Sequence, residues 1–176
     1  MAQGILSNLR VKAKLQVLVG TLLALAASSL ELVRELIRAA MHAPSAGNEQ
    51  PWHFIILTDH ELLSKIPDFH PYAGMMAEAP VAVLVCGDPR QEKHPGMWVQ
   101  DLAAATQNLL LAAHAKGLGA VWVGVHPRED RILPLRKLIE MPEAVIPFAL
   151  IPLGHPAEKA DPDDRYRPEL IHLNKW

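Results

Sequence analysis

A loop of small and polar residues is the stretch of this sequence best suited to holding a ligand. It reads Ala43-Pro44-Ser45-Ala46-Gly47-Asn48-Glu49-Gln50-Pro51-Trp52 and lies between a predicted helix and a predicted strand. Small side chains let the backbone approach a flat ligand closely, and Gly47 permits a tight turn. The side chains of Ser45, Asn48 and Gln50 offer hydrogen bonds. The loop indicates a binding site, with a plain helix-to-strand connector as the alternative.

The sequence lacks the motifs that are typical of several other kinds of functional site. The chain has no G-x-G-x-x-G, G-x-x-x-x-G-K-[ST] or G-x-S-x-G motif, which argues against a dinucleotide fingerprint, a P-loop and a nucleophile elbow. Its nine histidines show none of the pairings typical of a metal site, so we expect no metal. The one cysteine, Cys86, falls in an apolar stretch, where a thiol is usually inert. A net charge of -2 argues against a nucleic-acid partner.

Hydrophobic periodicity predicts the elements that position the loop. The 176 residues suit one domain of ordinary size. Helical spacing predicts a helix from about residue 30 to residue 43, capped by Ser28 or Ser29, and further helices over 59–66, 98–116 and 128–140. Apolar runs predict strands over 52–58, 81–86, 120–125 and 147–154. The run over 81–86 is typical of a central strand, whereas Pro147 and Pro152 suggest an edge strand or a strand end. The sequence therefore predicts a three-layer α+β or α/β domain.

Residues 1–29 form an atypical N-terminal segment ahead of a predicted domain over residues 30–176. Arg10, Lys12 and Lys14 precede an apolar run over residues 15–27, an arrangement similar to a signal peptide. The run is shorter than the ~20 residues of a membrane span, so a membrane protein is not expected. Three interpretations stay open for it: a helix buried in the fold or in a subunit interface, a targeting segment, or a membrane-surface anchor.

Three motifs, in order and spacing, resemble the FMN-dependent nitroreductase family over roughly residues 30–176. The first is the loop itself, A-P-S-A-G-N-x-Q-P-W-H-F, which resembles the signature loop of that family. The second is Ala115-Lys116-Gly117-Leu118-Gly119, which runs into Ala120-Val121-Trp122-Val123-Gly124-Val125. The third is the tail from Arg165 to His172, Arg-Tyr-Arg-Pro-Glu-Leu-Ile-His, with Trp176 at its end. The resemblance implies a mixed, mainly antiparallel sheet flanked by helices.

The resemblance also implies an enzyme, a cofactor and a partner. It implies a cytoplasmic homodimer with FMN at the subunit interface and a tail that exchanges between the subunits. NADH or NADPH would deliver hydride to flavin N5 and leave, and a nitroaromatic, a quinone or a similar flat small molecule would then take the electrons. Because the flavin brings its own redox chemistry, no side chain is expected to act as a catalytic residue.

By resemblance, particular residues of this sequence would hold the FMN. Pro44 and Ser45 would lie along the flavin, and Asn48 would bond to ring or ribityl groups. The main chain at Trp122 and Gly124 would pass the ring edge, with the Gly124 amide a candidate donor to N5. The phosphate would be reached by Arg165 and Arg167, since the arginine fork matches two phosphate oxygens; the alternative is a solvated pair beside nearby aspartates.

The sequence departs from the family pattern near its N-terminus. Family members carry an Arg-Arg-Ser-x-Arg cluster there, whereas this chain reads Asn8-Leu9-Arg10-Val11-Lys12-Ala13-Lys14. Arg10, Lys12 and Lys14 share one side only if the segment is extended. Either these residues stand in for the cluster, or the C-terminal arginines hold the phosphate, or cofactor binding is weakened.

The acceptor would stack on the open face of the flavin near Phe69 or Tyr72, in the connection over residues 67–80. Two other functions stay open beside the NAD(P)H oxidoreductase. One is a flavin-binding or degenerate protein with little turnover. The other is a specialised enzyme of the same fold, a reductive dehalogenase or a flavin-fragmenting enzyme.

Overall fold

The computed structural model describes residues 22–158 and 164–176, and only the backbone of residues 22–29. The N-terminal basic residues Arg10, Lys12 and Lys14 lie outside the described residues, as does most of the predicted apolar run. The division of the chain at residue 29 therefore stays a prediction. No helix of the described part is long and apolar enough to cross a membrane.

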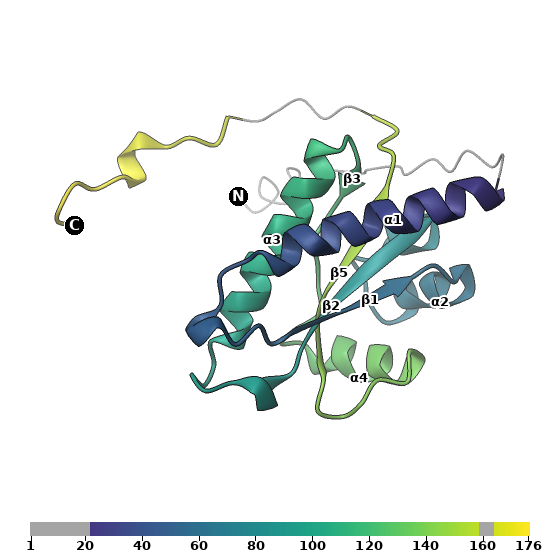
Figure 1. Cartoon of the computed structure of the whole chain (residues 1–176), viewed down its shortest axis with the longest axis horizontal. Coiled ribbons are helices and arrows are strands. Elements are labelled where there is room, and N and C mark those ends of the chain that lie inside the picture. Colours follow the sequence, from purple (N-terminus) through teal and green to yellow (C-terminus); the bar gives the residue numbers. More distant parts are fainter. Residues whose placement is uncertain (1–21, 159–163) are drawn as a thin grey trace, which may run out of the picture.

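An antiparallel sheet forms the middle of the described part (Figure 1). Three strands form its body: β1 (Trp52–Leu57), β2 (Val81–Gly87) and β5 (Ile146–Gly154), in the order β1-β2-β5. Two short strands, β3 (Gly119–Ala120) and β4 (Val123–Gly124), both pair with β5. Each of these pairs is antiparallel, which confirms the α+β class with a mainly antiparallel sheet.

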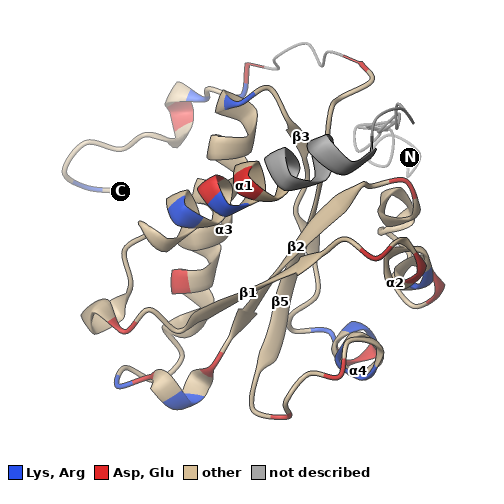
Figure 2. Cartoon of the chain, turned by 45° about the vertical axis from the view of Figure 1, so that its right-hand side comes forward, with Lys and Arg blue, Asp and Glu red and all other residues tan. Residues whose placement is uncertain are grey.

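Helices cover both faces of this sheet. On one face lie α1 (Leu22–Met41) and α3 (Trp98–Ala115), whose side chains share a core with Val83 and Val85 of β2. On the other face lie α2 (His60–Lys65) and α4 (Glu129–Leu138), which pack against Ala82, Leu84 and Cys86 of the same strand. Successive residues of a strand point to opposite faces, so β2 is buried on both sides, as its apolar sequence predicts. In Figure 2 the strands carry no charged residue along their length.

Local signals explain where the helices begin and end. Asp59 caps α2 by accepting a hydrogen bond from the amide of Glu61 at 2.8 Å. Gly117 follows α3 with φ +72°, a left-handed conformation that glycine adopts at little cost. An ion pair between Lys116 and Glu35 ties the end of α3 to α1. The sequence predicted α2, α3 and α4 to within a few residues at each end.

Three local predictions are wrong. The helix predicted to begin at Ser28 or Ser29 already includes Leu22, so neither serine is its cap. The strand predicted over 120–125 is broken between Ala120 and Val123. The two prolines do not mark an edge strand, because β5 lies between β2 and the two short strands, whereas the alternative of a strand end holds for Pro147, the second residue of β5.

The break between β3 and β4 explains how a proline fits inside the sheet. Leu153 of β5 pairs with Ala120 and Leu150 pairs with Val123, so Pro152 lies opposite the interruption. A proline has no N–H to donate to a neighbouring strand, and here no regular ladder demands one. The interruption between β3 and β4 therefore allows Pro152 to lie inside the sheet.

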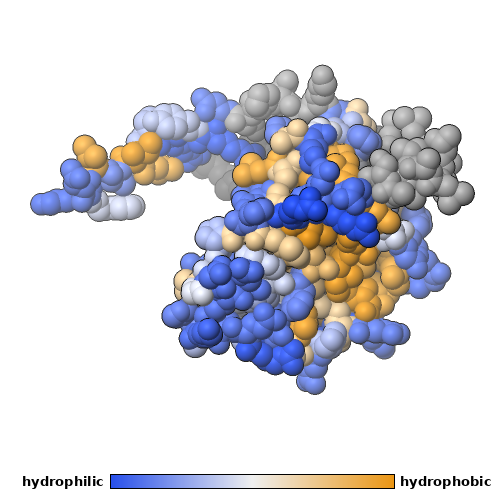
Figure 3. All heavy atoms as spheres, viewed as in Figure 1, coloured by the Kyte–Doolittle hydropathy of each residue, from blue (hydrophilic) through white to orange (hydrophobic). Residues whose placement is uncertain are grey.

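The C-terminal tail, residues 164–176, runs away from the sheet (Figure 1). It contains a short 3-10 turn over Pro168–Leu170 rather than a strand. Several large apolar side chains along it are exposed, and the hydropathy colouring of Figure 3 shows apolar residues on this arm. They are Tyr166, Leu170, Ile171, Leu173 and Trp176. Exposed apolar groups in such number indicate a surface that another surface covers.

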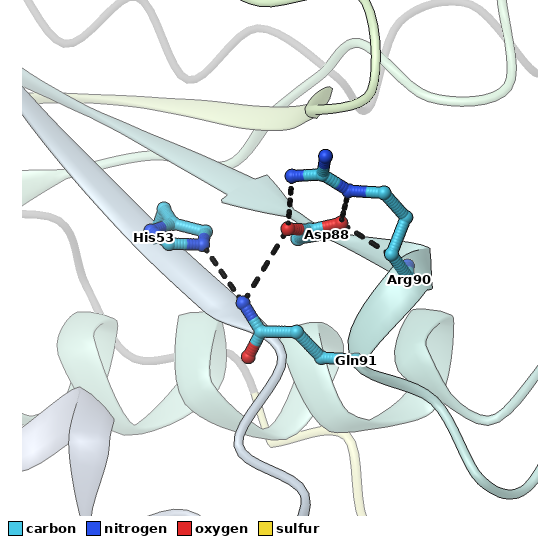
Figure 4. Close-up of polar contacts among 4 residues, drawn as sticks. All are labelled: His53, Asp88, Arg90 and Gln91. Carbon is cyan, nitrogen blue, oxygen red and sulfur yellow. Dashed lines mark hydrogen bonds and ion pairs between the residues drawn. The ribbon is translucent and has the colours of Figure 1, made fainter.

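His53, Asp88, Arg90 and Gln91 form a cluster of polar side chains at the C-terminal end of β2 (Figure 4). The nearly buried Asp88 carboxylate accepts two hydrogen bonds from the Arg90 guanidinium, at 2.8 and 2.7 Å. Gln91 bridges the Asp88 carboxylate, at 3.5 Å, and the His53 ring, at 3.2 Å. The amide of Asp88 donates to the carbonyl of Pro51 at 2.9 Å, which holds the exit of the 43–52 loop against β2.

Insertion of a methyl group at Gly87 should destabilise the fold. A Cβ built there would lie 2.6 Å from the Trp98 ring, which is fixed in the core. We expect Gly87→Ala to lower the free energy of unfolding by about 1–3 kcal/mol, the range for overpacking. Urea denaturation measures the loss. Gly74→Ala is the matched control, because its Cβ meets nothing within 4 Å; equal stability of the two variants would contradict the prediction.

The contribution of Asp88 to stability should depend on pH. The hydrogen bonds from Arg90 hold the pKa of the Asp88 carboxyl well below its ordinary value. A carboxyl whose pKa is lowered by folding stabilises the protein above its unfolded pKa, about 4, and this stabilisation is lost as the pH falls through the folded value. We expect Asp88→Asn to cost about 1 kcal/mol at neutral pH, a small value because Arg90 is largely exposed and screened.

Denaturation of wild type and Asp88→Asn at a series of pH values measures this effect. The difference between the two proteins should shrink as the pH is lowered below about 4. Arg90→Gln, which removes the other partner, should show the same pH profile. A difference that stays constant across this range would contradict the assignment.

Candidate active site

The loop after α1 is shaped by its own polar side chains. Ser45 precedes a 3-10 turn over Ala46–Asn48, and its Oγ accepts a hydrogen bond from the Gln50 amide at 3.1 Å. The Gln50 side chain donates to Oδ1 of Asn48 at 2.9 Å, which leaves the exposed Asn48 NH2 free to donate elsewhere. Gly47, Asn48 and Gln50 all have positive φ, between 51° and 56°. These bonds hold a conformation that non-glycine residues adopt at a cost.

Asp101 attaches this loop to the first turns of α3. Its Oδ1 accepts a hydrogen bond from the amide of Ala46 at 3.0 Å, and the residue is buried. The sequence placed Asp101 on α3 without predicting this role. An acidic residue on a face that is otherwise apolar was the available signal, because a buried carboxylate needs a hydrogen-bond donor.

Glu49 is buried at the centre of the loop. Its side chain is 1% exposed, and neither carboxylate oxygen has a hydrogen-bond partner among the described residues. The His94 ring approaches Oε1 at 3.8 Å. Burial keeps these oxygens out of direct contact with a ligand at the loop surface.

The second motif places backbone, rather than reactive side chains, beside open space. A Cβ built at Gly124 meets nothing within 4 Å. The Trp122 ring is 37% exposed and packs edge-on against Phe148, with ring centroids 5.6 Å apart. The carbonyl of Gly124 accepts hydrogen bonds from two side chains, Nε2 of His70 at 2.8 Å and Nη1 of Arg131 at 2.7 Å. Neither His70 nor Arg131 was singled out in the sequence.

The first turns of α3 connect the two motifs. Asp101 holds the loop through Ala46, and Trp98, one turn earlier, packs against His126 at 4.8 Å between ring centroids. His126 in turn stacks on Phe148, the residue that supports Trp122. Burial lowers the pKa of His126. Two segments some 75 residues apart in the sequence are thus both supported by the first turns of α3.

The two predicted acceptor residues lie in different environments. Phe69 is half-buried and packs against the core on the side of α2 and α4. Tyr72 is 72% exposed, and the guanidinium carbon of Arg131 lies 5.6 Å from its ring centroid. The structure therefore leaves Tyr72 accessible to a ligand near Gly124, whereas Phe69 contributes mainly to packing.

Of the predicted phosphate-binding residues, the two on the C-terminal tail do not lie beside the loop of their own chain. Arg165 and Arg167 are exposed on the C-terminal tail, which leads away from the sheet in Figure 1. Arg10 and Lys12 lie outside the described residues. Pro44 is exposed and Ser45 half-buried at the start of the loop. The described part of the chain thus groups the predicted ring-contacting residues around α3 and leaves Arg165 and Arg167 apart.

Neither metal nor thiol chemistry has support here. Among residues 22–158 and 164–176, no three His, Cys, Asp or Glu side chains cluster so that they could hold a metal ion. Cys86 is fully buried in β2, and burial raises the pKa of its thiol to about 12. A thiol with such a pKa is a poor nucleophile at neutral pH, in agreement with the expected inert role.

Comparison with known proteins places these features in a family. The model of the Nitroreductase family matches residues 28–72 and 69–155. A protein of Methanothermobacter thermautotrophicus named "Putative NADH dehydrogenase/NAD(P)H nitroreductase" is 55% identical over 146 residues, which cover 83% of this chain and 76% of that protein. A protein of the same name from Archaeoglobus fulgidus is 47% identical over 150 residues, covering 83% and 86% of the two chains.

Solved structures agree with these relatives. The crystal structure of a protein of that name from Parabacteroides distasonis matches with a TM-score of 0.79 and 43% identity, covering 83% of this chain and 86% of that one. The crystal structure of a Desulfovibrio desulfuricans protein, described as "a putative nitroreductase in complex with fmn", matches with a TM-score of 0.71 and 32% identity, covering 83% of this chain and 85% of that one. The fold, the loop and the matching relatives together show that this chain belongs to the nitroreductase family.

Proposed function

We propose that this chain is an FMN-dependent NAD(P)H oxidoreductase that reduces nitroaromatics, quinones or similar flat acceptors. The observation that carries the proposal is the joint attachment of the Ser45–Gln50 loop and the Trp122–Gly124 segment to the start of α3. It is supported by relatives named NAD(P)H nitroreductase and by a related structure that contains FMN.

The residues at this place fit a flat, polar-edged cofactor. The space at Gly124 lets a ring approach the backbone, and the exposed amide group of Asn48 can donate to ring or ribityl oxygens. The carboxylate of Glu49 is buried, so it is not offered to an anionic cofactor. In this proposal Pro44 and Ser45 border the ring, and the main chain at Trp122 and Gly124 lines its edge.

The protein's part in the reaction is to bind and orient the cofactor and to exclude water. When bound, FMN supplies the redox chemistry, taking hydride from NADH or NADPH and passing it to the acceptor. The hydrogen bonds that two loop amides donate to Ser45 Oγ and Asp101 Oδ1 keep the loop in place before any ligand arrives. A preorganised loop binds more tightly, because less conformational entropy is lost on binding.

Two copies of the chain would complete the site. The tail exposes five large apolar side chains, from Tyr166 to Trp176, which suit burial against a second copy. Arg165 and Arg167 lie on the same tail, so the docking that covers its apolar residues would also carry two positive charges to the partner. We propose that these arginines reach the FMN phosphate in a homodimer.

Purification with and without added FMN tests this function. The protein should be yellow, release FMN on denaturation, and run as a dimer by light scattering. It should oxidise NADH or NADPH in the presence of a quinone or a nitroaromatic. A colourless protein that takes up no FMN at any concentration would contradict the proposal and support a degenerate family member. Faster turnover with a halogenated phenol would favour a dehalogenase.

Removal of the Arg165 guanidinium should weaken cofactor binding. We expect Arg165→Ala to raise the Kd for FMN by roughly ten- to hundredfold, about 1.5–3 kcal/mol, because a hydrogen bond to a charged phosphate is lost. Quenching of flavin fluorescence on titration measures this Kd. Lys175→Ala, which removes a charge from the same tail, should leave the Kd nearly unchanged. An unchanged Kd in Arg165→Ala would remove Arg165 from the site.

A further inference from the structure

Arg131 lies beside the proposed flavin site and has no part in the function described so far. It is the third residue of α4, and its Nη1 donates to the carbonyl of Gly124 at 2.7 Å. Its guanidinium also lies over the ring of Tyr72, with 5.6 Å between Cζ and the ring centroid. Two contacts from different elements therefore fix a cation next to the backbone of Gly124.

The turn that carries Tyr72 is itself fixed to Gly124. His70 is 1% exposed, and its Nε2 lies 2.8 Å from the Gly124 carbonyl oxygen. The amide of Tyr72 donates to Nδ1 of the same ring at 3.3 Å, so Nδ1 is the acceptor and Nε2 carries the hydrogen. The Tyr72 ring, anchored in this way, remains 72% exposed. Arg131 and Tyr72 thus form a rigid pair at the surface.

The charge of Arg131 is not neutralised by a carboxylate of the described chain. Of the acidic residues on the same turn, Asp130 pairs with Arg128 at 3.3 Å, and Glu129 makes no ion pair among the described residues. The Nε of Arg131 is buried without an acceptor, and Nη1 is used by the Gly124 carbonyl. Its Nη2 has no described partner and is left for an incoming group. A guanidinium group with free Nη2 donors suits a carboxylate or a similar anion.

We propose that Arg131 and Tyr72 form an anion-binding subsite that selects aromatic carboxylates as acceptors. Arg131 supplies the charge and the donors, and the exposed Tyr72 ring supplies an aromatic surface for the flat part of the molecule. The position of the pair next to Gly124 would place such an acceptor beside the flavin. The inference rests on the proposed function, because Gly124 borders the flavin only in that proposal.

A matched pair of acceptors tests the subsite. 4-Nitrobenzoate and 4-nitrobenzyl alcohol differ at one substituent, which is anionic in the first and neutral in the second. We expect Arg131→Gln to lower kcat/KM for 4-nitrobenzoate by roughly ten- to hundredfold, the effect of losing a hydrogen bond to a charged group, with much less change for the alcohol. Arg131→Lys keeps the charge without the planar guanidinium, so its kcat/KM for 4-nitrobenzoate should lie between those of the wild type and Arg131→Gln.

Arg128→Gln is the matched control. Arg128 lies three residues earlier, is exposed, and is paired with Asp130. Its removal should therefore leave the ratio of kcat/KM for the two acceptors unchanged. Calorimetry with benzoate gives a readout that needs no turnover. Benzoate should bind to the wild type and to Arg128→Gln, and roughly ten times more weakly to Arg131→Gln.

The outcomes separate this inference from the function on which it rests. If the ratio of kcat/KM for the two nitro compounds is the same in Arg131→Gln as in the wild type, the proposed subsite is wrong, while the oxidoreductase proposal is unaffected. If instead the variant loses a preference for NADPH over NADH, the anion belongs to the reductant and the acceptor proposal is overturned. If the protein takes up no FMN, the proposed function fails, and benzoate binding that depends on Arg131 would still support the anion site.

Discussion

Burial of β2 on both faces is the constraint on which the rest of this structure depends. Its alternate side chains enter two separate cores, so helices must cover both sides of the sheet. Once α1 and α3 cover one face, the chain that leaves α1 must turn back to reach β1. That turn is the Ser45–Gln50 loop, and the start of α3 lies where it can support the loop through Asp101. The position of the candidate site follows from the packing of the sheet.

The polar groups of the site serve mainly to hold backbone in place. Ser45 and Asp101 each accept a hydrogen bond from a loop amide, and His70 and Arg131 share the carbonyl of Gly124. None of these contacts forms a nucleophile–base pair of the kind used in covalent catalysis. A site of this kind suits a bound cofactor that carries the redox chemistry, and the protein then contributes shape, donors and charge.

The sequence predicted the elements well where one physical signal dominated. Periodicity located α3, and an apolar run with no charge located β2. It failed where tertiary context outweighed the local signal. Pro152 reads as an edge residue, yet it is accommodated inside the sheet because the neighbouring strand is interrupted opposite it. In the same way, Ser28 and Ser29 are good cap residues, but α1 begins further upstream.

By itself the sequence determined the fold class, the loop and its family resemblance, because apolar periodicity and runs of small residues are local patterns. Only the tertiary structure decided which side chains meet at the site. The approach of His70 and Arg131 to one carbonyl joins residues that are 61 positions apart, and no local pattern encodes that contact. The burial of Glu49 was equally invisible, since its neighbours in the loop are small and polar. Contacts of this kind depend on how the two cores bring distant segments together. Local patterns in the sequence do not predict which distant segments will meet.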